Sequence, residues 1–312
     1  MLIDITDALA GRRLDKLLIE HIEGLGRATA RRWFAAGHVS KIDPTGRRYP
    51  ASKGELSREG WTLDVDMDPG ELSLDAVADA DVPFAVALET PRIVIVDKPA
   101  GVPSAPLRAA ESGTLAGGLL ARFPEMAGVG FSGREPGLCH RLDTDTSGLL
   151  VCARDAAAFD AITAAIRGRA LDKRYLLVCP AQPLADEDDI DLPLLTDKRR
   201  RVRAYRERRG SETTVEPTAR PARTHYRVLR RSGDRALVEA SAPRAHRHQI
   251  RAHFAAIGAP LVGDKLYGSE DEALSRHALH ASRIAYAGDD LIGAFDVSSP
   301  LPADLAALVA DA

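Results

Sequence analysis

The sequence predicts a globular protein of mixed helices and strands, divided into a small N-terminal unit and a larger C-terminal domain. Its 312 residues leave room for one large domain and a small one. Residues 1–68 alternate helix-like and strand-like segments, whereas residues 69–87 are acidic, hold no basic residue and show no apolar period. We therefore expect two folded parts, residues 1–68 and 88–312, joined by an acidic linker at 69–87.

Two helices and two strands are expected in the N-terminal unit. Apolar residues at 14, 17 and 18 follow a helical period, and a second helical segment runs from Arg27 to Ala36. A glycine follows at position 37, where helices commonly end. Strands are expected at Val39–Ile42 and, from the alternation of apolar and polar residues, at Trp61–Asp66.

Three arginines of the second helical segment, Arg27, Arg31 and Arg32, are about one turn apart, which favours a common face. Two interpretations of this row stay open: a solvated helix face, or a surface for the phosphates of a nucleic acid. The net charge of the chain is only −3. Any nucleic-acid footprint must therefore be local rather than spread over the whole surface.

Composition excludes several classes of protein. The three cysteines, Cys139, Cys152 and Cys179, are odd in number and far apart, so they predict neither a disulfide framework nor a zinc site. No apolar run approaches the roughly 18 residues that span a bilayer. The N-terminus carries acidic residues where a signal peptide carries basic ones, so we expect a cytoplasmic protein.

The densest group of reactive side chains lies at His140–Ser147, just before the apolar run Leu149–Ala153. This group joins two carboxylates, an arginine, a histidine and three hydroxyls, and the apolar run is typical of a buried strand. A polar loop that leads into a buried strand is a common way to hold a reactive group in a cleft. Asp143 is therefore a candidate nucleophile.

The remainder of the C-terminal domain predicts further helices and strands. A buried strand is expected at Ile93–Val96, and Asp155 can cap a helix over 156–167. Other strands are expected at 171–178, 224–229 and 236–240, and the segments 279–281 and 284–286 together predict one more short strand. A helix that Gly258 ends is also expected. The segment 198–209 holds eight basic residues against one acid. It is read as a mobile charged loop, a phosphate-contacting loop, or both.

The N-terminal unit resembles a known RNA-binding module. The residues that carry the resemblance are Arg13-Leu14-Asp15, Gly26 to Arg32, and Ala36-Gly37-His38-Val39, in that order and spacing. They are similar to the S-four-like module, named after a protein of the small ribosomal subunit. In such modules the second helix and the following turn meet RNA phosphates, which implies this role for Arg27, Arg31 and Arg32.

The C-terminal domain resembles the RluA-type pseudouridine synthases from about Ile93 onward. The family pattern H-R-L-D-x-x-T-S-G is matched at every fixed position by His140 to Gly148. Three later blocks follow in the family's order, and they are His248-Gln249-Ile250-Arg251, Gly263 to Gly268, and Leu279-His280-Ala281. The resemblance implies an α+β catalytic domain with a central, largely antiparallel mixed sheet and an RNA cleft.

The resemblance also implies roles for individual residues. Asp143 is the expected catalytic nucleophile, and Arg141 is expected to assist the flipping of the target base. Arg141 is two residues from Asp143, so on an extended segment the two side chains would share one face. Tyr175, on the strand after the central motif, is the expected aromatic partner of that base. Arg251 is the expected ion-pair partner of Asp143, since a nearby guanidinium favours the carboxylate form. His248 and Gln249 complete the set of expected substrate-binding residues.

One block departs from the family pattern. Members usually show G-R-x-H-Q before the later arginine, whereas Ala245 and His246 occupy the Gly and Arg positions here. Arg244 or Arg247 can compensate for the missing arginine. The positioning of RNA near this loop therefore differs from the family's usual arrangement.

Three alternatives were weighed against this interpretation. Asp143-Thr144-Asp145-Thr146 spells the D-x-D-x-T pattern of metal-dependent aspartate-nucleophile phosphatases, but in that class the apolar strand precedes the motif, and here it follows. Zinc binding by His246, His248 and His253 lacks any cysteine or acidic partner from 241 to 254. A non-catalytic RNA-binding protein is the third alternative, against which the intact Asp143 and Arg251 argue.

The reaction requires few chemical groups other than the nucleophile. Converting uridine to pseudouridine breaks the bond between ribose carbon 1 and base nitrogen 1, turns the base, and rejoins it through carbon 5. It involves no redox step and no phosphoryl transfer, so neither a cofactor nor a metal is required. We expect a monomer that acts on structured RNA, with large-subunit ribosomal RNA as the first candidate and transfer RNA as the alternative.

Overall fold

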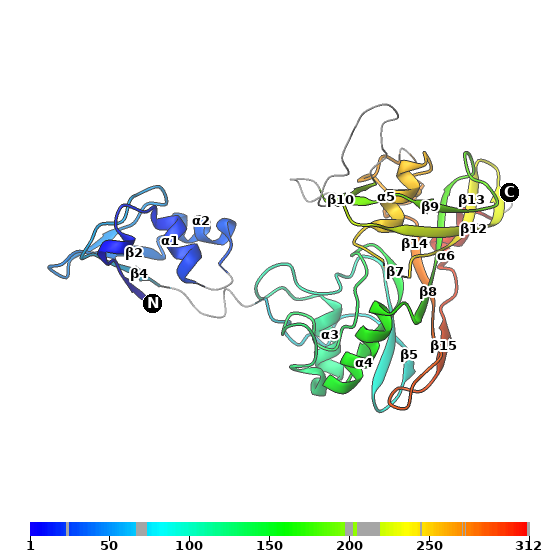
Figure 1. Cartoon of the computed structure of the whole chain (residues 1–312), viewed down its shortest axis with the longest axis horizontal. Coiled ribbons are helices and arrows are strands. Elements are labelled where there is room, and N and C mark those ends of the chain that lie inside the picture. The colour runs from blue at the N-terminus through cyan, green and yellow to red at the C-terminus, as the bar shows by residue number, and fades with distance from the viewer. Residues whose placement is uncertain are drawn as a thin grey trace. The chain divides into compact units, whose positions relative to one another are not determined.

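The computed structural model describes residues 1–22, 25–66, 74–196, 202–204, 219–243, 245–269, 271 and 273–310. The chain divides into two compact units (Figure 1). Unit 1 contains Met1–Leu74 and Leu107–Ala110, and unit 2 contains Asp75–Pro106 and Glu111–Ala312. The predicted basic segment 198–209 lies outside the described residues except for positions 202–204.

Unit 1 pairs a four-stranded antiparallel sheet with two α-helices. The strand order is β1-β4-β2-β3. The strands are β1 (Leu2–Asp4), β2 (Val39–Ile42), β3 (Arg48–Pro50) and β4 (Thr62–Val65), and the helices are the short 3-10 helix η1 (Asp7–Leu9), α1 (Leu14–His21) and α2 (Arg27–Ala36). The predicted second helix and the strand at Val39–Ile42 are confirmed residue for residue.

The core of unit 1 forms because both helices present an apolar stripe to the sheet. Leu14, Leu17 and Leu18 of α1 pack with Trp33 of α2, all of them buried. Gly37 ends α2 in the left-handed conformation, with φ of 81°, which glycine adopts without a steric cost. The three arginines of α2 are all exposed. Arg32 follows Arg31 directly and is therefore turned about 100° around the helix from it, so the row is wider than the predicted single face.

The expected linker at 69–87 is wrong over most of its length. Unit 2 begins at Asp75, and β5 begins at Ala85. The backbone N–H of Ala76 donates to the carbonyl of Gly133 at 2.9 Å, and that of Asp79 donates to the carbonyl of Gly117 at 3.0 Å. The segment is acidic, but Ala76, Phe84 and Val86 pack with a buried cluster that includes Leu115 and Leu119.

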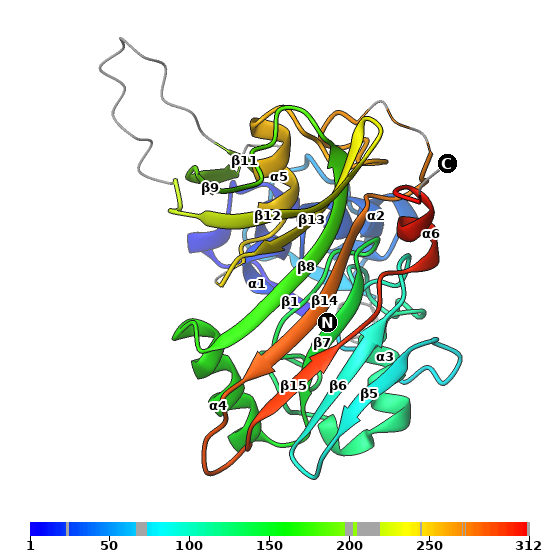
Figure 2. The ribbon, with the colours of Figure 1, turned by 90° about the vertical axis from the view of Figure 1, so that its right-hand side faces the viewer.

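Unit 2 is built on a nine-stranded mixed sheet. The strand order is β5-β6-β7-β14-β8-β13-β12-β9, with β15 added beside β14, and only the pair β7–β14 is parallel. The strands are β5 (Ala85–Glu89), β6 (Ile93–Lys98), β7 (Ser147–Ala153), β8 (Leu171–Pro180), β9 (Glu187–Asp191), β12 (Arg223–Ser232), β13 (Arg235–Ser241), β14 (Leu279–Tyr286) and β15 (Phe295–Ser298). The predicted largely antiparallel sheet is confirmed, and Figure 2 shows its long central strands β8 and β14 side by side. The two segments predicted at 279–281 and 284–286 form the single strand β14.

Helices and a small second sheet complete unit 2. They are α3 (Leu115–Arg122), the 3-10 helix η3 (Pro124–Met126), α4 (Ala156–Arg167), α5 (Gln249–Ala256), α6 (Ala303–Ala307), and the paired strands β10 (Leu194–Thr196) and β11 (Val202–Ala204). The predicted helix at 156–167 is confirmed, and the side chain of Asp155 accepts a hydrogen bond from the N–H of Ala158, as an N-cap does. Within the described part of the chain, no helix is both long and apolar enough to cross a bilayer.

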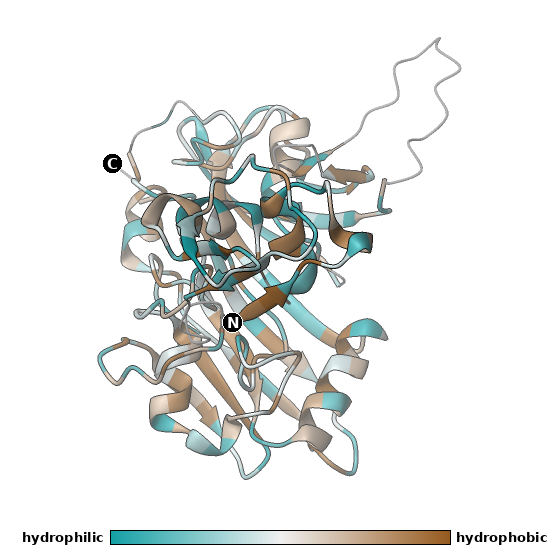
Figure 3. Ribbon diagram, turned by 90° about the vertical axis from the view of Figure 1, so that its left-hand side faces the viewer, coloured by the Kyte–Doolittle hydropathy of each residue, from teal (hydrophilic) through white to brown (hydrophobic). Residues whose placement is uncertain are grey.

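Strands β6 and β7 are buried because a helix covers each face of the sheet there. Ile93 and Ile95 of β6 pack with α4, whereas Val94 and Val96 pack with α3. Alternate residues of a strand point to opposite faces, so a strand covered on both sides needs an unbroken apolar run. Figure 3 shows the apolar colour following the strands, while polar colour collects on loops and exposed helix faces.

The start of β7 lies unusually close to β14. Gly148 has φ of 112°, and a Cβ at this position would lie 2.2 Å from the carbonyl oxygen of Ala281. Only glycine permits both the conformation and the approach. The parallel pairing of Ser147 with His280 follows from this approach. This pairing places the loop just before β7, residues 140–146, at the middle of the sheet.

Candidate active site

The predicted reactive group at His140–Thr146 forms a loop that leads into the buried strand β7, as its polar residues predicted. The backbone N–H of Thr146 donates to the carbonyl oxygen of Asp143 at 3.0 Å, which closes a turn. The Ser104 hydroxyl accepts a hydrogen bond from the backbone N–H of Leu142 at 3.1 Å and donates one to the carbonyl oxygen of Leu142 at 2.8 Å. The shared strand face expected for Arg141 and Asp143 is therefore wrong, and the loop is held by its backbone.

Lys98 is a second support of this loop. Its side chain is fully buried, and its Nζ donates to the carbonyl oxygens of Pro99 at 2.8 Å, Val102 at 2.7 Å and Thr144 at 2.9 Å. Burial lowers the pKa of Lys98 to about 8, although the charges of Asp145 and Asp143 oppose the shift. Three carbonyl acceptors match the three N–H donors of an ammonium group. Lys98 thus ties the loop to the turn that follows β6.

Asp143 forms the predicted ion pair with Arg251. Arg251 Nη1 lies 2.8 Å from Asp143 Oδ2, while its Nε and Nη2 bind both oxygens of Asp264 at 2.6 and 2.9 Å. Asp264 is 1% exposed and Arg251 is also buried, whereas the side chain of Asp143 is 25% exposed. Burial alone would lower the pKa of Arg251, but the two carboxylates outweigh burial and raise it. Asp143 is thus the solvent-facing end of a buried carboxylate–guanidinium–carboxylate array.

Tyr267 and His248 pack around the guanidinium of Arg251. The guanidinium carbon of Arg251 lies 5.2 Å from the centroid of the Tyr267 ring. The Tyr267 hydroxyl donates to the carbonyl of Val202 at 2.9 Å and lies 3.2 Å from His248 Nδ1. His248 Nε2 is 3.6 Å from Asp143 Oδ1. Burial lowers the pKa of His248 against the opposing charge of Asp143, so its ring is mainly neutral at neutral pH.

Tyr175 reaches the same region from β8. It is buried in the core between β13 and β14, paired in register with Ala240 and Ala281. Burial raises the pKa of Tyr175 to about 12, and the negative charge of Asp143 adds to the effect. The phenol therefore stays protonated throughout the neutral range. The charge of Asp143 thus acts on the Tyr175 phenol, and the expected contact of Tyr175 with the target base stays a prediction.

Arg141 and Gln249 lie in different surroundings from the expected ones. The Arg141 side chain is 52% exposed, and its Nη1 binds Glu135 Oε1 at 2.6 Å. Gln249 is buried, and its amide binds the carbonyl of Arg223 at 2.9 Å, the Thr224 hydroxyl at 3.1 Å and the N–H of His246 at 3.0 Å. Its amide is used within the protein, so we revise its role from substrate contact to support of the loop before α5.

The histidines once considered as zinc ligands have separate roles. His253 is buried between the Thr224 hydroxyl and the carbonyl of Leu192, both at 2.9 Å. His246 Nε2 lies 3.3 Å from the carbonyl of Pro221, and His248 faces Asp143. Of the two arginines considered as compensation for the departure at Ala245 and His246, Arg247 is exposed and Arg244 lies outside the described residues.

A comparison with protein families matches residues 92–256 to the model described as RNA pseudouridylate synthase, more than half of the chain. This chain belongs to the RNA pseudouridylate synthase family. It is therefore an enzyme that isomerises uridine in RNA, and the matched region contains β7, the loop of Asp143 and the helix of Arg251. The aspartate-nucleophile phosphatase alternative is wrong, because the D-x-D-x-T residues form part of the pseudouridine synthase motif.

The sequences of curated relatives align with nearly the whole of this chain. An uncharacterized RNA pseudouridine synthase of Chloroflexus aurantiacus is 35% identical over 94% of this chain and 87% of the relative. The ribosomal large subunit pseudouridine synthase D of Xanthomonas campestris is 30% identical over 98% of this chain and 90% of the relative. Among solved structures, human RNA pseudouridylate synthase domain containing 4 aligns with a TM-score of 0.57 at 22% identity, covering 71% of this chain and 90% of that one. This last likeness concerns the fold alone.

Sequence reasoning missed two members of the synthase's site, Asp264 and Tyr267. Both lie in the block Gly263–Gly268, which was recognised as part of the resemblance but given no role. A signal was present, because the block follows the buried residues Leu261 and Val262 just as the loop of Asp143 adjoins β7. What the sequence could not reveal is that Asp264 and Asp143 share one guanidinium.

His277 supplies a pH-dependent contribution to stability in this region. It is buried and shares a hydrogen bond of 2.7 Å with the Thr146 hydroxyl, and burial lowers its pKa to about 4. Because the folded pKa lies below the usual value of about 6.5, the unfolded chain takes up this proton first as the pH falls. The stability that neutral His277 provides is therefore complete above pH 6.5 and is lost as the pH falls toward 4, on the order of 3 kcal/mol.

We predict that His277→Gln reduces the loss of unfolding free energy between pH 7 and pH 4.5. Urea denaturation followed by circular dichroism at both pH values measures this loss. The matched control is His225→Gln, since His225 is far more exposed in the same unit. An equal loss in wild type and His277→Gln would contradict the prediction.

Proposed function

We propose that this RNA pseudouridine synthase modifies uridine in large-subunit ribosomal RNA, with Asp143 as its nucleophile. The substrate assignment is supported by the relatives named ribosomal large subunit pseudouridine synthase D, which the chain matches over 98% of its own length. The observation that carries the assignment of Asp143 is its partly exposed carboxylate, held at 2.8 Å by an otherwise buried arginine. Transfer RNA is the alternative substrate.

The test of the substrate is a map of pseudouridines in total RNA from cells with and without this protein. The expected result is the loss of one or a few sites in large-subunit ribosomal RNA, restored by wild-type protein and not by Asp143→Asn. Loss of sites only in transfer RNA would assign the alternative substrate. An unchanged map in both RNA classes would contradict the proposal.

The chemistry assigned to Asp143 follows from its surroundings. The carboxylate attacks the target nucleotide at ribose carbon 1 or at the pyrimidine ring, and the bond from carbon 1 to nitrogen 1 breaks. The turned base then rejoins through carbon 5, which gives up its proton, while nitrogen 1 gains one, so the reaction is an isomerisation with no net loss of atoms. Arg251 fixes Asp143 Oδ2 at 2.8 Å, while Oδ1 lies 3.6 Å from His248 Nε2.

The flipped base needs a ring beneath it and a group that fills the gap in the stack. We assign the first role to Tyr175, whose protonated phenol adds no negative charge beside Asp143. We assign the second to Arg141, because its half-exposed side chain can leave Glu135 at little cost, as is usual for ion pairs near solvent. His248 is assigned to orient Asp143 Oδ1 and to contact the substrate as a neutral ring.

We assign RNA affinity, but no chemistry, to unit 1. Arg27, Arg31 and Arg32 are exposed on α2, where each can neutralise a phosphate. We predict that replacing all three by alanine weakens binding to the full-length RNA substrate. The slope of log affinity against log salt should flatten by roughly 0.7–0.9 for each lost contact.

Maximal turnover of that triple variant on a short stem-loop should stay near the wild-type rate. The matched control is Arg48→Ala, which removes a unit 1 arginine that is already paired with Asp64. A slower rate at saturating stem-loop would mean that unit 1 helps to build the active site. We further propose that the enzyme acts as a cytoplasmic monomer.

A further inference from the structure

Unit 1 carries a second cluster of cations that surrounds aromatic rings rather than lying on α2. Lys41 Nζ lies 5.5 Å and the Arg58 guanidinium 5.7 Å from the centroid of the Trp61 ring. The Arg47 guanidinium lies 5.4 Å from the centroid of the Tyr49 ring. The two rings contact each other at a centroid distance of 5.7 Å and an angle of 36°. Three cations thus surround one pair of contacting, tilted aromatic rings.

The sheet itself assembles this cluster. Lys41 of β2 pairs in register with Tyr49 of β3 on one side and with Leu63 of β4 on the other. Residues paired across antiparallel strands share a face, and Trp61 precedes Leu63 by two residues, so it lies on that face as well. Segment 41–61 contains five basic residues against three acidic ones, in a chain whose net charge is −3. The local surface is therefore positive around a partly buried indole.

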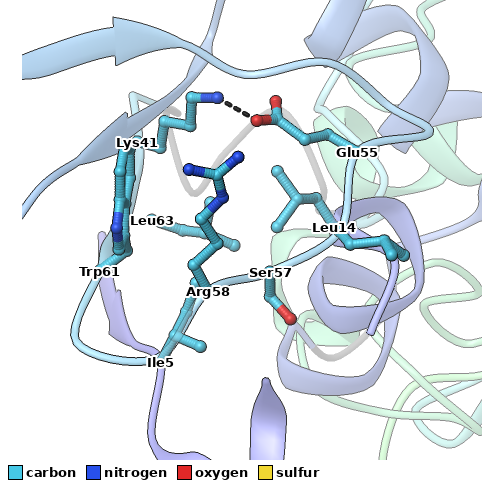
Figure 4. Close-up of a pocket in the computed structure, with 9 residues that line it drawn as sticks. Ile5, Leu14, Lys41, Glu55, Ser57, Arg58, Trp61 and Leu63 are labelled. Carbon is cyan, nitrogen blue, oxygen red and sulfur yellow. Dashed lines mark hydrogen bonds and ion pairs between the residues drawn. The ribbon is translucent and has the colours of Figure 1, made fainter. Parts of the chain in front are cut away.

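A pocket opens beside the indole (Figure 4). Figure 4 shows Trp61 on one side, Leu14 on the other and the Arg58 side chain between them, while Lys41 is held by Glu55. The Arg58 side chain occupies most of the room between Trp61 and Leu14, so a planar ring can lie over the indole only when that side chain moves aside.

We propose that the Trp61–Tyr49 cluster is a stacking site for one unpaired base of the RNA substrate. Aromatic rings with a cationic rim bind single strands because the ring stacks on the base while the cations meet the adjacent phosphates. A base within a duplex has both faces covered, so the ligand is an unpaired nucleotide. The base takes the place of the Arg58 guanidinium over Trp61. Among the described residues Arg58 forms no ion pair within 4 Å, so it is available to pair with the phosphate.

This inference rests on the proposal that unit 1 binds RNA, but it concerns different residues from the arginines of α2. Phosphate contacts alone would respond to charge and not to the presence of bases. A stacking site responds to the bases themselves. The two surfaces can therefore be distinguished by ligands that carry the same phosphates with and without bases.

The test exploits the two tryptophans of the chain. Trp33 is 3% exposed within the core, whereas Trp61 is partly exposed, so only Trp61 is accessible to a ligand. The full-length protein is titrated with a hexamer of adenosines, which contains no uridine to react, and with an abasic hexamer of the same phosphate number. The expected result is quenching of tryptophan fluorescence by the adenosine hexamer only.

Variants assign the signal to the site. Trp61→Phe should abolish the quenching but keep binding of the labelled hexamer within about threefold, because a phenyl ring still stacks. Trp61→Ala should bind roughly tenfold more weakly, the scale of one lost stacked base. Arg58→Ala should weaken the binding of both hexamers, while the control Arg48→Ala, which faces no ring, should leave quenching intact. Circular dichroism shows whether each variant is folded.

Equal quenching by both hexamers would overturn the proposal, and so would the absence of quenching by either hexamer. In the second case the cluster would bind a different ligand, such as an acidic peptide. Arg58→Ala and Trp61→Phe keep the test decisive even where Trp61→Ala does not fold. Tritium release from the natural RNA is measured in parallel. Normal release together with absent quenching refutes the stacking site and leaves the enzymatic assignment intact.

Discussion

Asp143→Asn should abolish uridine isomerisation while the protein stays folded and still binds RNA. An amide is a poor nucleophile, and removal of a covalent nucleophile typically lowers turnover by roughly 10⁴-fold or more. Asparagine keeps the shape of the side chain, and its carbonyl oxygen can still accept from Arg251 Nη1. Release of tritium from uridine labelled at carbon 5 measures turnover directly, and a filter-binding assay measures RNA affinity.

The matched control is Asp145→Asn, two residues along the same loop. Asp145 is exposed, and its backbone carbonyl, which the substitution leaves in place, accepts from Arg276 at 3.3 Å. We expect this variant to retain most of the wild-type rate. If Asp143→Asn kept appreciable turnover, or if Asp145→Asn lost as much, Asp143 would not be the nucleophile.

Arg251→Ala should cost both activity and stability, and the two losses should be separable. The substitution leaves Asp264, which is 1% exposed, as a buried carboxylate without its guanidinium. Breaking a buried ion pair in this way costs about 3–5 kcal/mol. It also removes the guanidinium that holds Asp143 Oδ2 at 2.8 Å, so the carboxylate loses its fixed position and turnover should fall.

The double variant Arg251→Ala/Asp264→Asn separates the two effects. Removing the buried charge at 264 should restore much of the unfolding free energy, because the remaining amide is neutral. It should not restore turnover, since Asp143 still lacks its partner. Urea denaturation and tritium release across a pH series make both measurements. A double variant that regained wild-type activity would show that Arg251 acts only through the fold.

Local signals in the sequence were sufficient for many individual elements. The apolar period at 14, 17 and 18 placed α1, the glycine at 37 placed the end of α2, and the aspartate cap placed α4, because capping and periodicity act within one or two turns of chain. The unbroken run Ile93–Val96 predicted a strand covered on both faces. These predictions depended on neighbours in the sequence, so they needed no knowledge of the rest of the fold.

Other predictions failed where the deciding contact was distant. The acidic composition of 69–87 predicted a linker, but residues from Asp75 onward pack with α3. Parity along an assumed strand placed Arg141 beside Asp143, whereas a turn in the loop and a pair with Glu135 direct Arg141 elsewhere. The composition of a segment and the alternation of its side chains are properties of that segment alone. Neither indicates which distant surface the segment packs against.

The sequence by itself determined the family, the nucleophile candidate and its arginine partner, because the motif residues stand at set positions within short blocks. Only the tertiary structure decided that Asp143 and Asp264 share Arg251. It also decided that Lys98 and Ser104 hold the loop by hydrogen bonds to its backbone carbonyls. Asp143 and Arg251 are 108 residues apart, and the close approach of β7 and β14 at Gly148 brings the loop of Asp143 to the middle of the sheet. Burial, charge sharing and exposure are properties of that assembled arrangement, so no single block of sequence contains them.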